Sequence, residues 1–209
     1  MKLYDFGPAA NAKRVRVFLA EKSVEIEKVE LDVRADAQLV EPYKSMNPFH
    51  CVPFLELDDG TIIAESIAIC RYVEAMHPEP SLFGRSDQEQ ATIEMWLRRV
   101  ELDMFLPLLH ALRNHVPMFA GRVVPGTRTD LPQLPEMVQR GKEMAAIFMD
   151  RVDPLMANRE FIVADRFTMP DLVAALTLNS AKMLGMELEG WPNIARWHAA
   201  IAARPSMEA

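Results

Sequence analysis

Residues 51–66 read CVPFLELDDGTIIAES, and this stretch decides the fold of the first half of the chain. Proline has no N–H and fits at the start or edge of a strand, so Pro53 predicts that a strand begins with the apolar residues after it. The turn signal DDG and the apolar run TII predict a hairpin with a returning strand. The sequence ESIAIC then predicts a helix that starts close to Glu65.

The two ends of this stretch also predict a binding site. If the peptide bond before Pro53 is cis, the N–H and C=O of Val52 are open to a peptide-like ligand, which pairs with them as an added strand. Ser66 lies at a helix start, where free N–H groups attract a carboxylate. Either feature alone is more often a surface proline or an ordinary capping serine, but the pair favours a site for a peptide carboxylate.

The segments around this hairpin predict an α/β domain over residues 1–77. A short strand near residues 3–6 ends at Gly7-Pro8, a helix begins near Asn11, and the alternation over residues 25–31 predicts a second strand. A weaker helix is predicted over residues 36–44 and another over 65–76. This order gives a four-stranded mixed sheet with helices on both faces, similar to the thioredoxin fold but without its Cys-x-x-Cys motif.

The rest of the chain predicts an all-helical bundle domain over residues 87–209, after a proline-containing linker over residues 78–86. Pro107 predicts a kink in a long helix. Thr168 and Asp171 resemble a capping box at the start of a later helix, and a last helix begins near Pro192. The expected apolar faces are Ile93, Leu97, Val100, Met104 and Leu108; Met137, Met144, Phe148 and Val152; and Ile194, Trp197 and Ile201.

Composition excludes several classes of protein. Half of the 209 residues are hydrophobic, yet no apolar run approaches the roughly 18 residues of a membrane span. The 30 acidic and 23 basic residues give a net charge of −7 without a Lys/Arg block, so a nucleic-acid partner is not expected. Cys51 and Cys70 form no disulfide framework, and the N-terminus lacks the apolar stretch of a signal peptide. We therefore expect a cytoplasmic protein, and no metal site.

Three segments in this order resemble the cytosolic glutathione transferase superfamily, and in particular its bacterial-type members. They are residues 47–53 (NPFHCVP), 65–72 (ESIAICRY) and 161–171 (FIVADRFTMPD), and the resemblance covers nearly all of the chain. It implies that glutathione is the co-substrate, that the second substrate is a small hydrophobic electrophile, and that the chain forms a homodimer.

The same resemblance implies a role for five residues in binding glutathione. Val52 pairs with the backbone of the central cysteine, Pro53 is the cis proline, and Ser66 bonds the γ-glutamyl carboxylate. Glu65 faces the γ-glutamyl ammonium or braces the turn, and His50 contacts the glycine carboxylate. Two alternatives stay open, namely a first-turn acid for Glu65 and an exposed loop histidine for His50.

The group that activates the thiol is an open point in the sequence. One hydrogen bond to a thiolate, worth about 1.5–3 kcal/mol, lowers a thiol pKa of about 8.5 by about one to two units. In relatives a serine, cysteine or tyrosine supplies it, but here the serine position falls on Ala9. Asn11 matches the asparagine of that pattern, so it is the candidate catalytic donor, with a plain N-cap as the alternative. Tyr4 is a further candidate, although a mid-strand tyrosine is more often core.

Four other residues could lie at or near the site, and all but Cys70 have two possible roles. Cys51 precedes Val52 and either forms a mixed disulfide with glutathione or is a rim thiol with an ordinary pKa. Cys70 falls on an apolar helix face and is expected in the core. Glu101 and Asp103 either belong to a solvated face or assist the glutathione ammonium across a dimer.

Three functions remain open on the sequence alone. The leading one is transfer of glutathione to small hydrophobic electrophiles. The expected lining of the pocket is Met104, Leu108, His115, Met118 and Phe119. Cys51 and the missing serine favour, alternatively, glutathione-dependent reduction of disulfides or peroxides. Alanine at position 9 also allows a glutathione-binding module that lacks catalysis.

Overall fold

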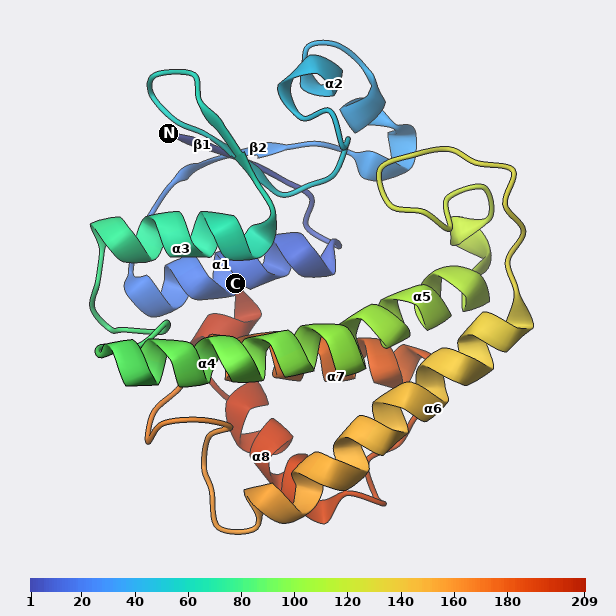
Figure 1. Ribbon diagram of the computed structural model, residues 1–209. Coiled ribbons are helices and arrows are strands. Elements are labelled where there is room, and N and C mark those ends of the chain that lie inside the picture. The colour runs from blue at the N-terminus through green and yellow to red at the C-terminus, as the bar shows by residue number, and fades with distance from the viewer. The chain divides into compact units, whose positions relative to one another are not determined.

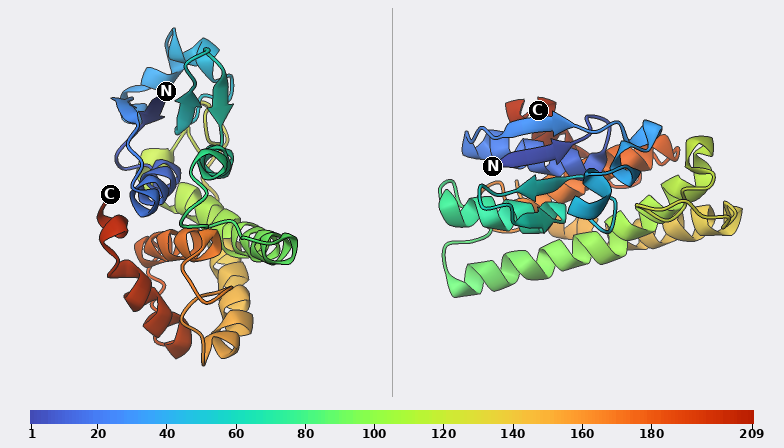
Figure 2. Two further views of the ribbon diagram at one scale, coloured as in Figure 1. Left: turned by 90° about the vertical axis from the view of Figure 1, so that its left-hand side faces the viewer. Right: turned by 90° about the horizontal axis from the view of Figure 1, so that it is seen from above.

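A computed structural model describes residues 1–209 (Figures 1 and 2) and divides them into two units, which we describe separately. The first unit contains residues 1–80 with 124–128 and 208–209, and the second contains residues 81–123 and 129–207. Along the chain the first division falls between Pro80 and Ser81. The linker over residues 78–86 stays a prediction.

A four-stranded mixed sheet forms the centre of the first unit. Its strands are β1 (Lys2–Asp5), β2 (Glu27–Glu30), β3 (Phe54–Glu56) and β4 (Ile62–Ala64), in the order β2-β1-β3-β4. β1 and β2 are parallel and are joined by α1 (Ala10–Lys22), whereas β3 runs antiparallel to β1 and to β4. This topology confirms the thioredoxin-like sheet.

The two faces of the sheet are covered by different helices. Tyr4 and Phe54 point to the face that carries the short α2 (Tyr43–Met46), where they cluster with Leu31. Because side chains alternate along a strand, Leu3 and Leu55 point to the opposite face, and both are fully buried. On that side α1 and α3 (Ser66–Met76) lie next to each other (Figure 2).

The predicted helix over residues 36–44 is wrong. The chain forms two 3-10 turns, Val33–Ala35 and Ala37–Leu39, before α2. The side chain of Asp32 accepts two backbone N–H groups of the first turn at 2.9 and 3.4 Å, and Asp36 has a left-handed φ of 59°. Aspartate that bonds its local backbone competes with an α-helix, which is why the helical pattern misled the prediction.

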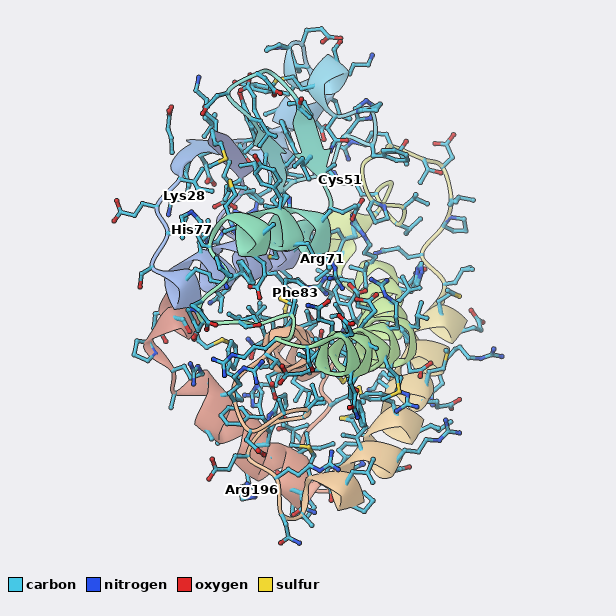
Figure 3. The ribbon with its side chains drawn as sticks, turned by 60° about the vertical axis from the view of Figure 1, so that its left-hand side comes forward. Lys28, Cys51, Arg71, His77, Phe83 and Arg196 are labelled. Carbon is cyan, nitrogen blue, oxygen red and sulfur yellow. The ribbon has the colours of Figure 1, made fainter.

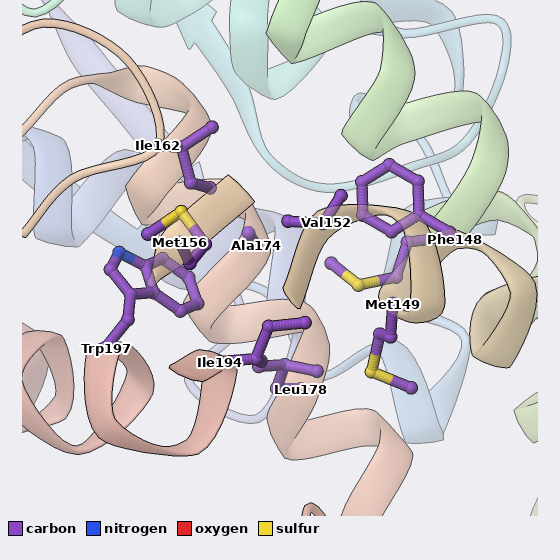
Figure 4. A pocket seen from close by; sticks show the side chains of 10 residues that line it. Phe148, Met149, Val152, Met156, Ile162, Ala174, Leu178, Ile194 and Trp197 are labelled. Carbon is purple, nitrogen blue, oxygen red and sulfur yellow. The ribbon is translucent and has the colours of Figure 1, made fainter. Parts of the chain in front are cut away.

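The second unit is a helical bundle, as predicted. Its helices are α4 (Asp87–Val100), α5 (Leu106–His115), α6 (Pro135–Val152), α7 (Met169–Met183) and α8 (Pro192–Ala202), with 3-10 turns at Pro117–Phe119, Asp153–Met156 and Pro205–Glu208. α7 is buried along most of its length against α4, α5 and α8. A cavity of about 20 Å³ remains in this core, lined by apolar side chains that include Met156 and by the ring of Trp197 (Figure 4). No helix of the chain is both long enough and apolar enough to cross a membrane.

Pro107 marks an interruption in the long helix. A π-helical segment, Glu101–Phe105, connects α4 to α5. Proline offers no N–H to the carbonyl of Asp103 four residues earlier, and a π turn accommodates a missing bond of this kind. The helix thus widens just before Pro107.

The apolar face of α6 is only partly buried. Phe148 and Val152 of the expected apolar face lie in the core, whereas Met137 and Met144 of the same face are 37 % and 42 % exposed. Both line a surface groove of about 120 Å³ between α5 and α6, which we call the α5–α6 groove. Its other lining residues are Leu102, Leu106, Pro107, His110, Arg140 and Gly141.

Candidate functional site

Three connections leave the sheet of the first unit at the same end. In the register of the sheet Phe54 lies opposite both Tyr4 and Ala64, so the chain before β3 leaves beside the chain after β1 and after β4. These connections are Val52-Pro53, the turn before α1, and Glu65-Ser66. The N-termini of α1 and α3 follow two of them, and their positive dipole ends suit an anionic ligand.

Val52 presents a free backbone at this end of the sheet. The Val52-Pro53 bond is cis, and neither the N–H nor the C=O of Val52 makes a backbone hydrogen bond within the protein. Buried Asn47 braces the preceding loop, because its Nδ2 donates to the carbonyl of Cys51 at 2.8 Å and its Oδ1 accepts the N–H of Phe49 at 3.1 Å. The loop therefore offers a donor and an acceptor to an extended peptide.

Ser66 is the first residue of α3 and is only 4 % exposed. The equally buried Arg14 of α1 donates from Nη1 to Ser66 Oγ at 3.5 Å. Since the hydroxyl oxygen accepts this bond, its proton stays available for a ligand carboxylate. The buried guanidinium also adds positive charge at the helix N-terminus.

Glu65 occupies the N-cap position of α3 with a φ of 70°, in the left-handed region that residues with a side chain seldom adopt. Its exposed carboxylate makes no capping bond. Strained backbone of this kind tends to gather at binding sites. The carboxylate is thus free to meet a cation at the same end of the sheet.

Charged side chains fix the turn between β1 and α1. Arg16 Nη1 binds both carboxylate oxygens of buried Asp5 at 2.8 and 2.9 Å, and its Nη2 donates to the carbonyl of Gly7 at 2.8 Å. Glu30 accepts the N–H of Gly7 at 3.0 Å. These bonds hold the turn, and with it the N-terminus of α1, in place at the site.

Asn11 is the second residue of α1, whose N-cap is Ala9, so the plain N-cap alternative is wrong. Its Oδ1 is buried without a hydrogen-bond partner. Buried polar atoms of side chains are usually paired, and an asparagine amide carries two further N–H donors on Nδ2. Asn11 is therefore a polar group at the start of α1 that no capping bond occupies.

Comparison with known proteins gives this arrangement its family. Residues 1–75 match the glutathione S-transferase N-terminal domain, and residues 123–205 match the C-terminal domain. A glutathione S-transferase domain-containing protein of Marinobacter aquaeolei has a solved structure that is 32 % identical, with a TM-score of 0.89 over 99 % of this chain and 100 % of that chain. The chain belongs to the glutathione S-transferase family.

Two further relatives agree with this assignment. The solved glutathione S-transferase of class Gtt2 from Vibrio parahaemolyticus is 33 % identical, with a TM-score of 0.85 over 100 % of this chain and 96 % of its own. Glutathione S-transferase 2 of Saccharomyces cerevisiae is 28 % identical over 211 residues, covering 100 % of this chain and 88 % of the yeast protein. The predicted superfamily, fold class and assignment as a glutathione transferase are confirmed.

The loop before Val52 carries two more predicted residues of this glutathione transferase. His50 is half-buried, and its Nδ1 lies 3.2 Å from the carbonyl oxygen of Gly126. Cys51 is half-buried and forms no disulfide (Figure 3). The second cysteine, Cys70, is fully buried in α3, and burial raises the pKa of its thiol. Only Cys51 is partly open to solvent.

Tyr4 is excluded as the thiol activator. Its hydroxyl donates to Glu56 at 2.8 Å, and its ring stacks on Phe54 with the centroids 4.4 Å apart. Burial, and then the hydrogen bond to Glu56, raise the pKa of Tyr4 to about 12. The side chain is a core element on the α2 face of the sheet.

The expected lining of the electrophile pocket needs correction. Met104 and Leu108 are 2 % and 0 % exposed in the core of the helical unit, so they do not line an open pocket. Glu101 pairs with Arg98 at 3.0 Å. A role of Glu101 or Asp103 across a dimer stays a prediction. The chain has no group of three or more potential ligands that could hold a metal ion.

Two residues at the site, Arg14 and Asn47, were not predicted from the sequence. Arg14 lies in the buried stripe of α1 beside Ala12 and Val15, and a charge inside an apolar stripe was the signal that could have revealed it. Asn47 directly precedes a proline in the loop, where an asparagine is ordinary. Only its two hydrogen bonds distinguish it.

Proposed function

We propose that the protein transfers glutathione to small hydrophobic electrophiles. Val52 pairs with the peptide backbone of glutathione, beside Pro53, and Ser66 binds the γ-glutamyl carboxylate. Glu65 meets the γ-glutamyl ammonium, and His50 the glycine carboxylate. The observation that carries the proposal is the free backbone of Val52, which shares one end of the sheet with Ser66 and two helix N-termini.

The chemistry needs a thiolate held near neutral pH. Asn11 donates a hydrogen bond from Nδ2 to the sulfur, and the backbone N–H groups at the start of α1 donate to it as well. The Oδ1 atom of Asn11 is buried without a partner, which supports this role. The thiol proton leaves to solvent, and the sulfur attacks an electrophilic carbon to form a C–S bond. In a substitution the departing group takes the bonding electron pair, and in an addition the substrate takes up a proton instead.

Glutathione-dependent reduction is the second candidate, because Cys51 is a half-buried cysteine, outside any disulfide, next to Val52. One substrate disulfide is reduced to two thiols as Cys51 and one glutathione form a mixed disulfide. A second glutathione then restores the Cys51 thiol and leaves as glutathione disulfide. Steady-state assays separate the candidates. Turnover of a chlorinated nitroaromatic with glutathione supports the transferase, and turnover of hydroxyethyl disulfide supports the reductase. Activity with neither, despite bound glutathione, would leave a binding module.

We further propose that the protein works as a homodimer in the cytoplasm. The apolar side chains that line the α5–α6 groove, with Leu102 56 % exposed, support an interface between two copies. Ile67, a half-buried apolar residue of α3, is a second candidate for this interface.

A further inference from the structure

Residues Val124–Arg128, which we call the strap, group with the first unit although the chain on both sides of them belongs to the second. Two contacts hold the strap on the first unit. Arg128 forms an ion pair with Asp36, in the turns before α2, and the carbonyl oxygen of Gly126 lies 3.2 Å from Nδ1 of His50. The strap therefore reaches the residue that is proposed to bind the glycine end of glutathione.

Only glycine fits at position 126. A Cβ at this position would lie 1.9 Å from the carbonyl oxygen of Phe49 and 2.9 Å from Sγ of Cys51. The φ of Gly126 is 72°, in the left-handed region that favours glycine. A glycine in this conformation brings the strap backbone directly against residues 49–51.

The contact with Gly126 decides where His50 carries its proton. A carbonyl oxygen only accepts, so Nδ1 of His50 must be the donor. The second ring nitrogen, Nε2, makes no hydrogen bond within the protein. In a neutral ring with the proton on Nδ1, Nε2 is a bare acceptor and repels a carboxylate. Nε2 can donate to a carboxylate only after it gains a proton of its own.

We propose that the strap is a positioning element of the glutathione site, and that it makes His50 bind the glycine carboxylate as an imidazolium, with uptake of one proton from solvent. The inference rests on the proposed function, since it needs glutathione at Val52 and Ser66. Around this contact, Cys51 lies on the loop of His50, and Arg128 on the strap pairs with Asp36 of the turns before α2, which also carry Asp32 and Arg34. None of these supplies the proton.

Calorimetry at pH 7.5 in two buffers of different ionisation enthalpy tests the proposal. The probes are S-methylglutathione, which has no thiol proton to release, and its glycinamide, which lacks the glycine carboxylate. We expect the wild-type protein to take up close to one proton per site with S-methylglutathione and almost none with the amide.

Gly126→Ala and Gly121→Ala form a matched pair of variants. Both glycines have a left-handed φ, 72° and 69°, but a Cβ at Gly121 meets only the carbonyl oxygen of Thr129 at 3.7 Å. Gly126→Ala should weaken S-methylglutathione about tenfold, the loss of one charge-assisted bond, and change the affinity for the amide less than twofold. Its proton uptake should fall, because a released His50 can carry its proton on Nε2. Gly121→Ala should behave as wild type.

Two more variants keep the test decisive if Gly126→Ala lowers the melting temperature. Arg128→Gln removes the second anchor of the strap and should shift affinity and proton uptake in the same direction. His50→Ala should abolish the uptake. Wild-type binding of S-methylglutathione without proton uptake, or a Gly126→Ala protein with unchanged affinity and uptake, overturns the role of the strap alone. Absence of binding to the wild-type protein overturns the proposed function as well.

Discussion

Single side chains decide whether this glutathione site can work with alanine in place of the usual serine. Asn11 is placed at the start of α1, its Oδ1 is buried without a partner, and it does not cap the helix. If its amide donates to the thiolate, Asn11→Ala should raise the pKa of the bound thiol by about one to two units. Activity should then fall at neutral pH and largely return at high pH.

The thiolate absorbance of bound glutathione against pH measures this effect directly. Asn11→Asp is the matched variant, because aspartate has nearly the same shape but its charge repels a thiolate. Its midpoint should lie above that of the wild-type protein. A common midpoint in all three proteins would remove Asn11 from the mechanism and leave the backbone N–H groups at the start of α1 as donors.

Ser66 offers a second prediction at the level of one residue. Ser66→Ala should remove a charge-assisted hydrogen bond worth about 1.5–3 kcal/mol and weaken glutathione binding about tenfold or more. Arg14 remains in place, so the fold should persist. Calorimetry gives the affinity and thermal melting gives the control. Unchanged affinity in a folded variant would mean that the γ-glutamyl carboxylate is bound elsewhere.

The sequence predicts residues whose role follows from their local chemistry, and it misses those that act over long separations. Pro53 and Ser66 are readable because a proline opens a strand and a serine starts a helix wherever they stand. Arg14 reaches Ser66 across 52 positions, and Gly126 reaches His50 across 76. Nothing local signals such contacts.

At the level of elements, the start of α7 depends on Asp171. Its carboxylate accepts the N–H of Ile162 at 2.8 Å, the N–H and hydroxyl of Thr168 at 3.0 and 2.9 Å, and Nε1 of Trp197 on α8 at 3.0 Å. The predicted capping box is present, and it also ties the chain before α7 to α8. The structure thus gives Asp171 more partners than the capping motif alone implies.

Because Asp171 has more partners than Thr168, its substitution should lower the free energy of unfolding more. Thr168→Ala should lower the free energy of unfolding by about 1 kcal/mol, the usual cost of a lost cap. Asp171→Ala strands several buried donors and should cost about 3 kcal/mol or more. Urea denaturation compares the two variants. Turnover per folded molecule should stay at the wild-type value in both, and a loss of turnover without a loss of stability would contradict a structural role.

His198 on α8 makes the packing of the helical unit sensitive to pH. Burial lowers the pKa of His198, the charge of Lys182 lowers it further, and a hydrogen bond to the carbonyl of Ala175 opposes both. As the pH falls below about 6.5, the unfolded histidine gains a proton before the folded one does. The unfolded state then binds more protons, so the stabilising contribution present above this pH is progressively lost.

His198→Asn keeps a donor for the Ala175 carbonyl and removes the titrating ring. Free energies of unfolding between pH 8 and pH 5 should fall more steeply for the wild-type protein than for this variant. Burial also raises the pKa of Asp171 to about 6, which acts with the opposite sign and is common to both proteins. The difference between the two curves therefore isolates His198, and parallel curves would refute its role.

Helices and strands were predictable from the sequence where a single pattern of apolar residues dominated. The strands follow from alternation and from a turn at Gly60, and the helices from apolar residues at helical spacing. Residues 36–44 carried a helical pattern as well, but local bonds of Asp32 and the left-handed Asp36 replaced the helix. In α6 the pattern gave the helix, yet it did not distinguish the buried Phe148 from the exposed Met144. Periodicity locates an apolar stripe without saying what covers it.

At the scale of the whole molecule, the exposed stripe leads to the prediction of a homodimer. The α5–α6 groove gathers several apolar side chains in one place. A contiguous apolar patch of this kind fits an interface that a second copy covers better than it fits the scattered apolar residues of a monomer surface. Light scattering at micromolar concentration should give twice the chain mass of 23.7 kDa. Leu102→Glu places a charge at the edge of the groove and should shift the mass towards one chain, because burying an unpaired carboxylate is costly.

Met183→Glu is the matched control for this variant. Met183 is 61 % exposed near the end of α7, similar to the 56 % of Leu102, but it does not line the groove. The control should keep the wild-type mass, so that a change in Leu102→Glu cannot come from added charge alone. A wild-type mass near 23.7 kDa would refute the homodimer. Dissociation of both variants to the same extent would place the interface away from the groove.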